Sequence, residues 1–283
     1  MTPAERRVAR ALLATYPTAG LESLPQLADG AGVTGPTVLR FVRKIGFEGY
    51  PDFQRSLREE VQARTEGLPS LYRTKGATQD DEVLRRSQQA FTRALDATLA
   101  SSSLEDDLAR VVALLCDRKR RVWFVGGRFS QLVATYLCLQ LRMLRPGCAM
   151  VGEAPERRVL DSLELSRKDV LCVFDYRRYQ RDTIAAGKVA AEQGAAVIVF
   201  TDPWLSPAVE SARHVLISHA DSVSPFDSLL GAFALTELLA AKVVVALGGE
   251  GQARVAEIEA VHERIHDPMI TAADVDGEGA RAG

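Results

Sequence analysis

The strongest constraint on the fold is a series of short apolar runs that alternate with helical patterns from residue 121 onward. Strands that are apolar throughout are buried on both faces, which is typical of a parallel sheet covered by helices. The predicted strands are residues 121–127, 148–153, 169–175, 195–202 and 212–220, and the main predicted helices among them are residues 130–144, 181–194 and 225–247. This order predicts an α/β sandwich of three layers around a parallel sheet.

The N-terminal residues show a different, all-helical pattern. Four helices are predicted within residues 3–64, and a polar segment broken by Gly and Pro follows them. Helical patterns resume from about Glu82 to Cys116. We therefore predict an all-α domain at residues 1–64, a linker at 65–80, an α/β domain at 81–270 and a disordered tail at 271–283.

The charge permits a nucleic-acid contact, and the cysteine usage favours a protein of the reducing cytoplasm. The formal net charge of -2 includes a slightly basic head, since residues 1–64 hold nine Lys or Arg against seven Asp or Glu. The four cysteines stand singly within apolar runs, which favours buried thiols over disulfides or a zinc site. No apolar segment resembles a signal peptide, and the longest apolar run is interrupted by Glu237 and Lys242. We expect no membrane contact.

The stretch "VTGPTVLRFVRKIGFEGY" predicts an amphipathic helix with a cationic face. Thr34 is a suitable N-cap, and Pro36 is tolerated in the first turn. At about 100° per residue, Val38, Phe41 and Val42 share one side, opposite the arginines. The residues proposed to contact a duplex are Thr34, Gly35, Pro36, Thr37, Arg40, Arg43 and Lys44. The spacing from the preceding helix fits a helix-turn-helix, and it also fits a helical bundle with a solvated basic face.

The same stretch resembles the N-terminal domain of RpiR/MurR-type bacterial transcription regulators. That family reads Leu-Ala-x-x-x-x-Val-Ser/Thr-x-x-Ser/Thr-Val-x-Arg-Phe, then Lys-x-x-Gly-Phe-x-Gly-Tyr/Phe. This chain has Leu27, Ala28, Val33, Thr34, Thr37, Val38, Arg40 and Phe41, then Lys44, Gly46, Phe47, Gly49 and Tyr50. The resemblance implies a helix-turn-helix head followed by a sugar-isomerase-type (SIS) α/β domain that binds phosphosugars.

A glycine turn after the first strand of that domain is the first candidate ligand site. In "VWFVGGRFSQLVA", Gly126 and Gly127 end the strand and Ser130 opens a helix. Free N–H groups and the positive end of a helix dipole at such a turn attract anions. Ligands of open parallel sheets bind at the carboxyl ends of the strands.

The next strand end departs from the SIS pattern. Sugar-phosphate-binding SIS domains carry Ser-x-Ser-Gly-x-Thr there, whereas this chain has Asp175, Tyr176, Arg177 and Arg178. Arginine suits a carboxylate or phosphate through paired hydrogen bonds, and Asp175 would hold an arginine or accept from a ligand hydroxyl. The alternative is an internal salt bridge that fills the pocket.

Further polar residues fall at the same predicted edge of the sheet. Thr201 lies at the end of a predicted strand. Ser222 and Ser224 are predicted, with Asp227, at the start of the last long helix, where they suit an anion or polyol or simply cap the helix. An H-E-x-x-H match at residues 262–266 lacks the context of a zinc peptidase. We expect no cofactor and no metal.

These features together predict a cytoplasmic, ligand-responsive transcription regulator rather than an enzyme. Operator DNA would bind the all-α domain (the head). A small anionic effector, such as a carbohydrate derivative (a sugar phosphate or sugar acid) or another carboxylate, would bind the α/β domain (the body). A homodimer or homotetramer would present paired recognition helices to half-sites. Two alternatives are a SIS-type sugar-phosphate isomerase, with Glu153 or Glu156 as base, and a regulator whose body only dimerises.

Overall fold

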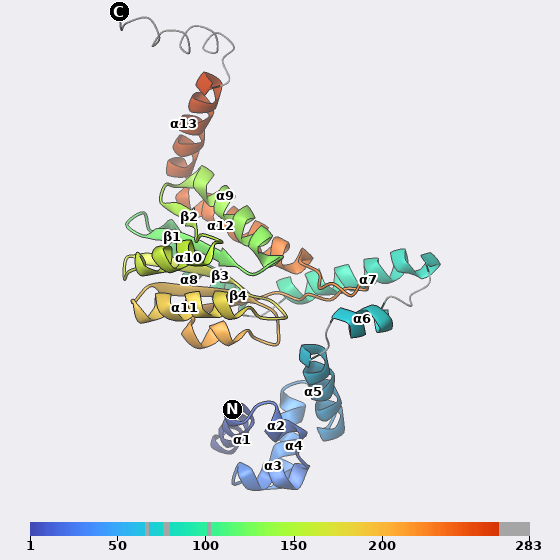
Figure 1. The fold of residues 1–283 in the computed structure, drawn as a ribbon. Helices are drawn as coiled ribbons and strands as arrows, with labels where there is room; N and C mark the ends of the chain where they lie inside the picture. Colours follow the sequence, from blue (N-terminus) through green and yellow to red (C-terminus); the bar gives the residue numbers. More distant parts are fainter. Residues whose placement is uncertain (66–67, 76–79, 101–102, 266–283) are drawn as a thin grey trace, which may run out of the picture. The chain divides into compact units, whose positions relative to one another are not determined.

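The computed structural model describes residues 1–65, 68–75, 80–100 and 103–265 (Figure 1). The chain divides into two compact units, Met1–Ala77 and Thr78–Gly283. The first unit is all-helical and the second is built on a parallel sheet, so the predicted fold class is confirmed. The predicted tail, residues 271–283, lies outside the described residues.

The N-terminal unit is a bundle of short helices around one apolar core. Its helices are α1 (Pro3–Ala14), α2 (Thr18–Leu21), α3 (Leu24–Gly30), α4 (Gly35–Lys44), α5 (Tyr50–Thr65) and α6 (Leu68–Lys75). The core residues include Val8, Leu12, Leu27, Val38, Phe41, Val42, Phe53 and Leu57. Val38, Phe41 and Val42, predicted on the apolar face of α4, are therefore buried, whereas Ile45, the next apolar position of this face, lies at the C-cap and is exposed.

Helix α6 lies within the segment predicted as a linker. Pro69 stands in its first turn, where the missing N–H removes no helical hydrogen bond. Leu71, on this helix, is buried. The Gly and Pro residues of this segment predict a break, whereas Pro69 occupies a position that a helix tolerates.

The second unit contains all five predicted strands. Its elements are α7 (Asp80–Leu99), α8 (Leu104–Cys116), β1 (Arg121–Gly126), α9 (Ser130–Leu144), β2 (Cys148–Met150), α10 (Pro155–Leu163), β3 (Asp169–Phe174), α11 (Arg181–Glu192), β4 (Ala196–Thr201), the 3₁₀ helix η1 (Pro207–Ser211), β5 (His214–Ile217), α12 (Leu230–Leu247) and α13 (Gly249–Ile265).

The sheet is parallel throughout, with the strand order β2-β1-β3-β4-β5. Val122 of β1 pairs with Cys148 on one side and with Val170 on the other. The strand order reverses between β1 and β3, which makes their carboxyl ends a topological switch point. In open α/β sheets, ligands bind in the crevice at this place.

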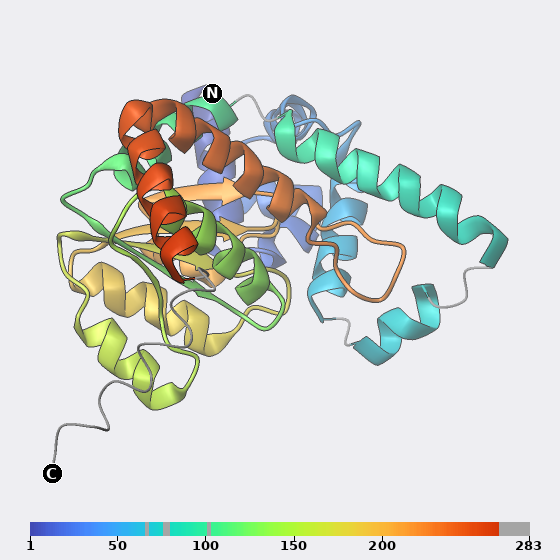
Figure 2. The ribbon, with the colours of Figure 1, turned by 90° about the horizontal axis from the view of Figure 1, so that it is seen from above.

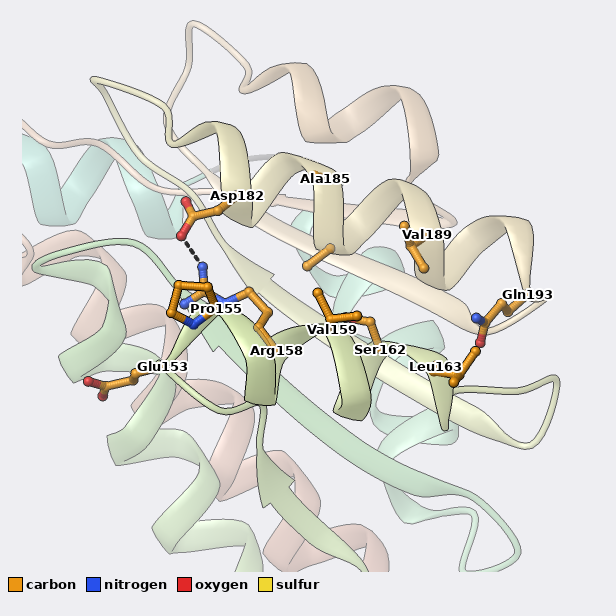
Figure 3. A pocket seen from close by; sticks show the side chains of 11 residues that line it. Glu153, Pro155, Arg158, Val159, Ser162, Leu163, Asp182, Ala185, Val189 and Gln193 are labelled. Carbon is orange, nitrogen blue, oxygen red and sulfur yellow. Dashed lines mark hydrogen bonds and ion pairs between the residues drawn. The ribbon is translucent and has the colours of Figure 1, made fainter.

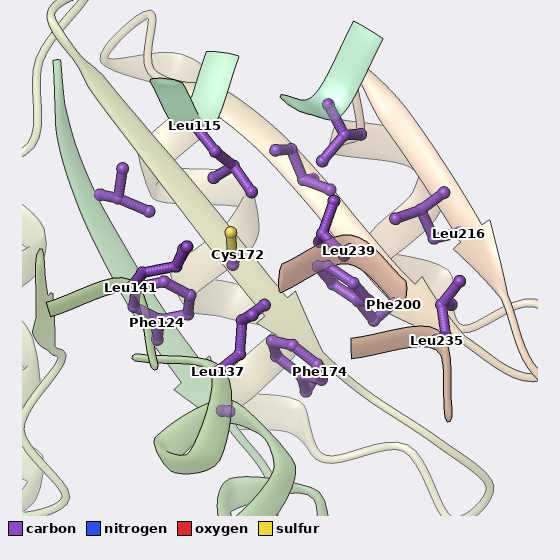
Figure 4. Packing of buried hydrophobic residues seen from close by; sticks show 14 of the residues in the cluster. Leu115, Phe124, Leu137, Leu141, Cys172, Phe174, Phe200, Leu216, Leu235 and Leu239 are labelled. Atoms are coloured by element: carbon purple, nitrogen blue, oxygen red, sulfur yellow. The ribbon is translucent and has the colours of Figure 1, made fainter. Parts of the chain in front are cut away.

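Two apolar layers cover the two faces of the sheet. On one face, α8, α9 and α12 pack over residues such as Phe124, Cys172 and Phe200 (Figure 4). Phe174 and Phe200 stack there with ring centroids 4.1 Å apart. On the other face, α11 and η1 cover Val173 and its neighbours. Figure 2 shows α13, in red, beside α9, in green, and contacts join these two helices.

Helix α12 differs from its prediction in where it begins and in how deeply it is buried. It begins at Leu230 rather than near Pro225, so Ser222, Ser224 and Asp227 lie in the loop before it and not in its first turn. Within the described part of the chain, α12 alone is long and apolar enough to cross a membrane by length and composition. Leu235, Leu239 and Val243 pack on the sheet, as core helices of soluble proteins do, while Val244 and Val245 are exposed.

Helix α10 was missed because its apolar side chains point outward. Val159, Leu160 and Leu163 are exposed, whereas Asp161 and Ser162 are buried. The usual pattern of apolar residues toward the core is therefore inverted on this helix.

Candidate functional site

A helix-turn-helix in the N-terminal unit places α4 at the surface. The turn between α3 and α4 contains Gly32, whose φ of +61° favours glycine, and Val33 donates its backbone N–H to the Ala28 carbonyl at 2.9 Å. Pro36, Arg40 and Arg43 are exposed. Their spacing of four and three residues puts them on one face of α4.

The two arginines of this face are available to an external anion. Within the described part of the chain, Arg40 donates to the Thr37 hydroxyl at 3.5 Å and Arg43 donates to the Glu48 carbonyl oxygen at 3.4 Å. Among the described residues, no carboxylate pairs with either guanidinium. Because no described carboxylate neutralises these exposed cations, they suit phosphates or a guanine edge.

Lys44 has an internal partner instead. Its ammonium donates to the carboxylate of Glu5 at 2.9 Å, and Glu5 is buried in α1. The hydrogen bond from Lys44, followed by that from the Thr2 backbone, lowers the pKa of Glu5. Lys44 therefore joins α4 to α1, a role that the sequence did not indicate.

The two threonines at the start of α4 also differ from their prediction. Thr34 occupies the N-cap position, but its hydroxyl lies 3.2 Å from the Thr37 hydroxyl and makes no capping bond to a backbone N–H. Thr37 is buried, Thr34 is exposed and Gly35 is half-buried. Of the seven residues predicted to contact DNA, five are exposed: Thr34, Pro36, Arg40, Arg43 and Lys44, of which Lys44 is held by Glu5.

The glycine turn after β1 is closed by its own side chains. Ser130 donates its hydroxyl to the Phe174 carbonyl at 2.7 Å and accepts from the Gly127 N–H at 2.9 Å. The Gly126 N–H donates to the Gln131 side chain at 2.8 Å. The amide groups predicted to receive an anion therefore already have partners within the chain.

Asp175 is enclosed and does not pair with the arginines beside it in the sequence. Its carboxylate accepts from the Gln180 N–H at 3.1 Å and from the Ser206 hydroxyl. The residue is almost fully buried, and burial raises the pKa of its carboxyl to about 6. The expectation that Asp175 holds an arginine is wrong: its oxygens bind the backbone and a serine of the next loop.

Arg177 and Arg178 converge instead on one carboxylate from a distant loop. Arg177 donates to Asp227 at 3.2 Å and Arg178 donates to it at 2.7 Å. We call these three residues the Arg–Asp cluster. The Arg177 guanidinium also lies 4.9 Å from the centre of the Trp204 ring, in a cation–π contact. The loop after β3 is thereby joined to the loop after β5.

Arg178 adopts a left-handed backbone conformation, with φ of +73°. In the SIS motif Ser-x-Ser-Gly-x-Thr, a glycine stands at the corresponding fourth position, and glycine adopts this conformation without strain. Arg178 thus places a cation at a backbone position whose conformation favours glycine.

Asp202, directly after β4, binds the loops at the same edge of the sheet. It accepts from the Arg177 N–H at 2.6 Å, the Tyr179 hydroxyl at 2.8 Å and the Trp204 N–H at 3.0 Å. Burial is the first cause of the raised pKa of this carboxyl. Asp202 therefore fixes the backbone from which the Arg177 side chain projects.

Some of the remaining predicted ligand residues are buried with internal hydrogen-bond partners, and the others lie near the surface. The Thr201 hydroxyl accepts from the Ser206 N–H at 3.0 Å, and the Tyr176 hydroxyl accepts from Ser218 at 2.9 Å; both residues are buried. Ser222 and Ser224 lie in the loop before α12, with their hydroxyls 3.1 Å apart and Ser224 exposed. Only these serines and the arginines remain near the surface.

A separate pocket of about 450 Å³ lies between α10 and α11 (Figure 3). An ion pair of Arg158 with Asp182 marks one end, and Gln193 lies at the other. Glu153, the candidate base of the isomerase alternative, lines this pocket, but no sequence signal indicated the pocket itself. Among the described residues, no group of three or more His, Cys, Asp or Glu side chains is arranged to hold a metal ion.

Comparisons with known proteins match both units. Residues 1–64 match the helix-turn-helix domain of the rpiR family, and residues 114–242 match the SIS domain. The transcriptional regulator HexR of Pseudomonas aeruginosa is 27% identical over 205 residues, which cover 71% of this chain and 69% of that protein.

Two solved structures are similar as well. The sugar isomerase domain of an RpiR transcription factor from Sphaerobacter thermophilus is 26% identical, with a TM-score of 0.60 over 63% of this chain and 99% of that one. NanR of Vibrio vulnificus, solved with ManNAc-6P, is 19% identical, with a TM-score of 0.56 over 94% and 95%. At that identity the NanR match supports the fold alone.

Proposed function

The chain belongs to the RpiR-type helix-turn-helix regulators, and from that premise we propose that its SIS domain senses a small anionic metabolite and thereby alters operator binding. The head, residues 1–64, would bind DNA and the body, residues 81–270, would bind the effector, with residues 65–80 between them. Because the target is operator DNA, we place the protein in the cytoplasm.

The observation that carries the proposal is the Arg–Asp cluster. Two guanidinium groups converge on one carboxylate, and that carboxylate belongs to a different loop from the arginines. Paired guanidinium groups suit a planar carboxylate or a phosphate equally well. An effector anion would therefore take the place of the Asp227 carboxylate.

Displacement of the Asp227 carboxylate by the effector would allow the domain to respond to binding. Asp227 lies three residues before α12, so its release would free the loop that leads into this helix. A ligand shifts a conformational equilibrium only through its different affinity for the two states, and competition with Asp227 supplies that difference. The direction of the effect on DNA affinity is open to either sign.

The effector class follows from the charge of the site and its polar neighbours. A sugar phosphate, a sugar acid or another carboxylate would bring the anion for Arg177 and Arg178 and hydroxyls for Ser222 and Ser224. The ManNAc-6P bound by NanR is an example of the first class. Thr201, Tyr176, Ser130 and Asp175 would support the site from beneath, because the structure gives their side chains internal partners.

Association with a second copy would complete the regulator. Recognition helices of dimeric helix-turn-helix proteins bind half-sites about one helical turn apart. The exposed Val244 and Val245 of α12 and Leu139 of α9 are apolar surface that a second copy would cover.

A regulator whose body only dimerises is the second candidate, since it also accounts for arginines with an internal partner. A thermal-shift screen with sugar phosphates, sugar acids and simple carboxylates separates the two. We expect at least one anion to raise the melting temperature of the wild type. The same anion should leave the Arg177→Gln/Arg178→Gln variant unshifted. An absence of any shift in the wild type, or an equal shift in the double variant, supports the dimerising body.

A further inference from the structure

Helix α1 of the head carries three arginines that have no part in the function proposed above. Arg6, Arg7 and Arg10 are exposed. Among the described residues, none of the three pairs with a carboxylate. An exposed arginine whose charge no carboxylate neutralises is either solvated surface or a binding residue for an external anion. The position of α1 beside α4 favours the second role for two of them.

An ion pair at the boundary between core and surface joins α1 to α4. Lys44 donates to Glu5 at 2.9 Å, and the Lys44 side chain is 50% exposed, whereas that of Glu5 is 4% exposed. The two helices also contact each other. Because the pair lies where the interface between the helices reaches solvent, the residues on its outer side in each helix share one surface of the head.

On α4, the outer side of this ion pair holds Arg40. At about 100° per residue, Phe41 lies about 60° around the helix from Lys44, and Arg40 lies about 40° in the opposite direction. Phe41 is buried in the core, and Arg40 is exposed. The direction from core to surface on α4 therefore runs from Phe41 through Lys44 to Arg40.

On α1, the outer side of the ion pair holds Arg6 and Arg10. Val8, a core residue, lies about 60° around the helix from Glu5. Arg6 and Arg10 lie about 100° and 140° from Glu5 in the opposite direction. Arg7, at about 200°, is on nearly the opposite side of α1 from Glu5. Arg6 and Arg10 therefore lie on the surface that α4 presents to DNA, whereas Arg7 does not.

The dimensions of B-DNA place such a neighbouring helix over a phosphate strand. The axes of packed helices are about 8–10 Å apart. The major groove is about 12 Å wide, so it admits one helix. With α4 in the groove, α1 would lie above the sugar–phosphate strand that borders it. Arginine binds phosphate oxygens through charge-assisted hydrogen bonds.

We propose that Arg6 and Arg10 of α1 bind the phosphate backbone beside the groove that α4 reads. The inference rests on the proposed function, because it requires that α4 binds DNA. Phosphate contacts hold a protein in register on any duplex and carry no sequence information directly. The two arginines would therefore add affinity and salt dependence, but not sequence preference.

Fluorescence anisotropy of the full chain at about 50–200 mM KCl tests the assignment. The probes are a duplex enriched from genomic fragments on the wild-type protein and an unrelated duplex of equal length. For Arg6→Gln/Arg10→Gln we expect the slope of log affinity against log salt to become shallower by about 1.8, since each phosphate contact contributes about 0.9. Both duplexes should lose affinity by the same factor.

Two matched variants show whether position and charge account for the effect. Arg7→Gln removes one charge from the other side of the same helix and should keep the wild-type slope. Arg6→Lys/Arg10→Lys keeps both charges and should also retain most of the slope, because an ammonium binds phosphate as a point charge. If the double glutamine variant fails to fold, Arg10→Gln alone should make the slope shallower by about 0.9.

The outcomes separate this inference from the function on which it rests. An unchanged slope in the glutamine variants, an equal change in Arg7→Gln, or a loss confined to the enriched duplex overturns the role of α1. If Arg40→Ala loses affinity while Arg6→Gln/Arg10→Gln keeps the wild-type slope, only this inference fails. If the wild-type protein binds neither duplex, the proposed function fails, and the role of α1 fails with it.

Discussion

Arg178 donates to Asp227 at 2.7 Å, although 49 positions separate the two residues in the sequence. The bond joins the loop after β3 to the loop that precedes α12. Arg178 makes it from a left-handed backbone conformation, which costs a non-glycine residue about 1–3 kcal/mol. The charge-assisted bond to Asp227 offsets this strain. An anion that replaces Asp227 would therefore act on a loop in which a strained backbone and a stabilising bond oppose each other.

Asp227→Asn should raise the affinity for the effector anion. The substitution removes the internal competitor for Arg177 and Arg178, and hydrogen bonds between charged groups contribute about 1.5–3 kcal/mol. We expect an increase of about tenfold or more in isothermal titration with the anion identified by thermal shift. Asp221→Asn, in the same loop, is the matched control and should bind as the wild type does. A weaker or unchanged affinity for Asp227→Asn would rule out competition.

Arg178→Gly and Arg178→Ala should differ in stability. Both lose the bond to Asp227, but only alanine retains the strain at a φ of +73°. We expect the glycine variant to be more stable by about 1 kcal/mol in urea unfolding. If alanine proves equal or better, the loop relaxes once the arginine is removed, and the strain account fails.

Asp175→Asn should change how stability depends on pH. Burial raises the pKa of Asp175 to about 6, above its value in the unfolded chain. The folded state therefore binds more protons between about pH 4 and pH 6, and the free energy of unfolding falls as the pH rises through this window. The variant should lack this decrease, which is on the order of 3 kcal/mol. If the free energy of unfolding changes with pH in the same way for both proteins, the raised pKa of Asp175 is contradicted.

Lys44→Met should destabilise the head and make its stability less dependent on pH in the acid range. Lys44 lowers the pKa of the buried Glu5, so the pair stabilises the folded state above the unfolded pKa of a glutamate. That contribution is lost as the pH falls through the lowered folded pKa. We expect a lower melting temperature at pH 7 and little difference below pH 3. A variant as stable as the wild type at pH 7 would mean that the pair contributes nothing.

The strands and the main helices of the body could be predicted because their apolar side chains point into the core. β3 and β4 are apolar at every central position, and α9 begins and ends where its pattern does. Helix α10 could not be found in this way, since Val159 and Leu163 face solvent. Helix α6 was hidden by Pro69, whose helical position only the structure reveals.

The sequence predicted that the polar residues of the candidate site lie at one edge of the sheet, but not how they pair. Sequence order brings Asp175, Arg177 and Asp227 to one edge of the sheet, because parallel strands end together. Which carboxylate meets which arginine depends on the path of the loops, and that path places Asp227 rather than Asp175 beside the guanidinium groups. In the head, the pairing of Lys44 with Glu5 likewise depends on how α1 packs against α4.

The most direct test of the account concerns Arg40, which α4 exposes without a carboxylate partner. Fragments of the organism's genomic DNA are selected on the wild-type protein, and the affinity of the enriched duplex is measured by fluorescence anisotropy. For Arg40→Ala the account predicts a loss of about 1–3 kcal/mol in binding free energy, while Arg118→Ala, a matched change in the α/β body, retains full affinity. Equal affinities of Arg40→Ala and the wild type would contradict the claim that α4 reads DNA.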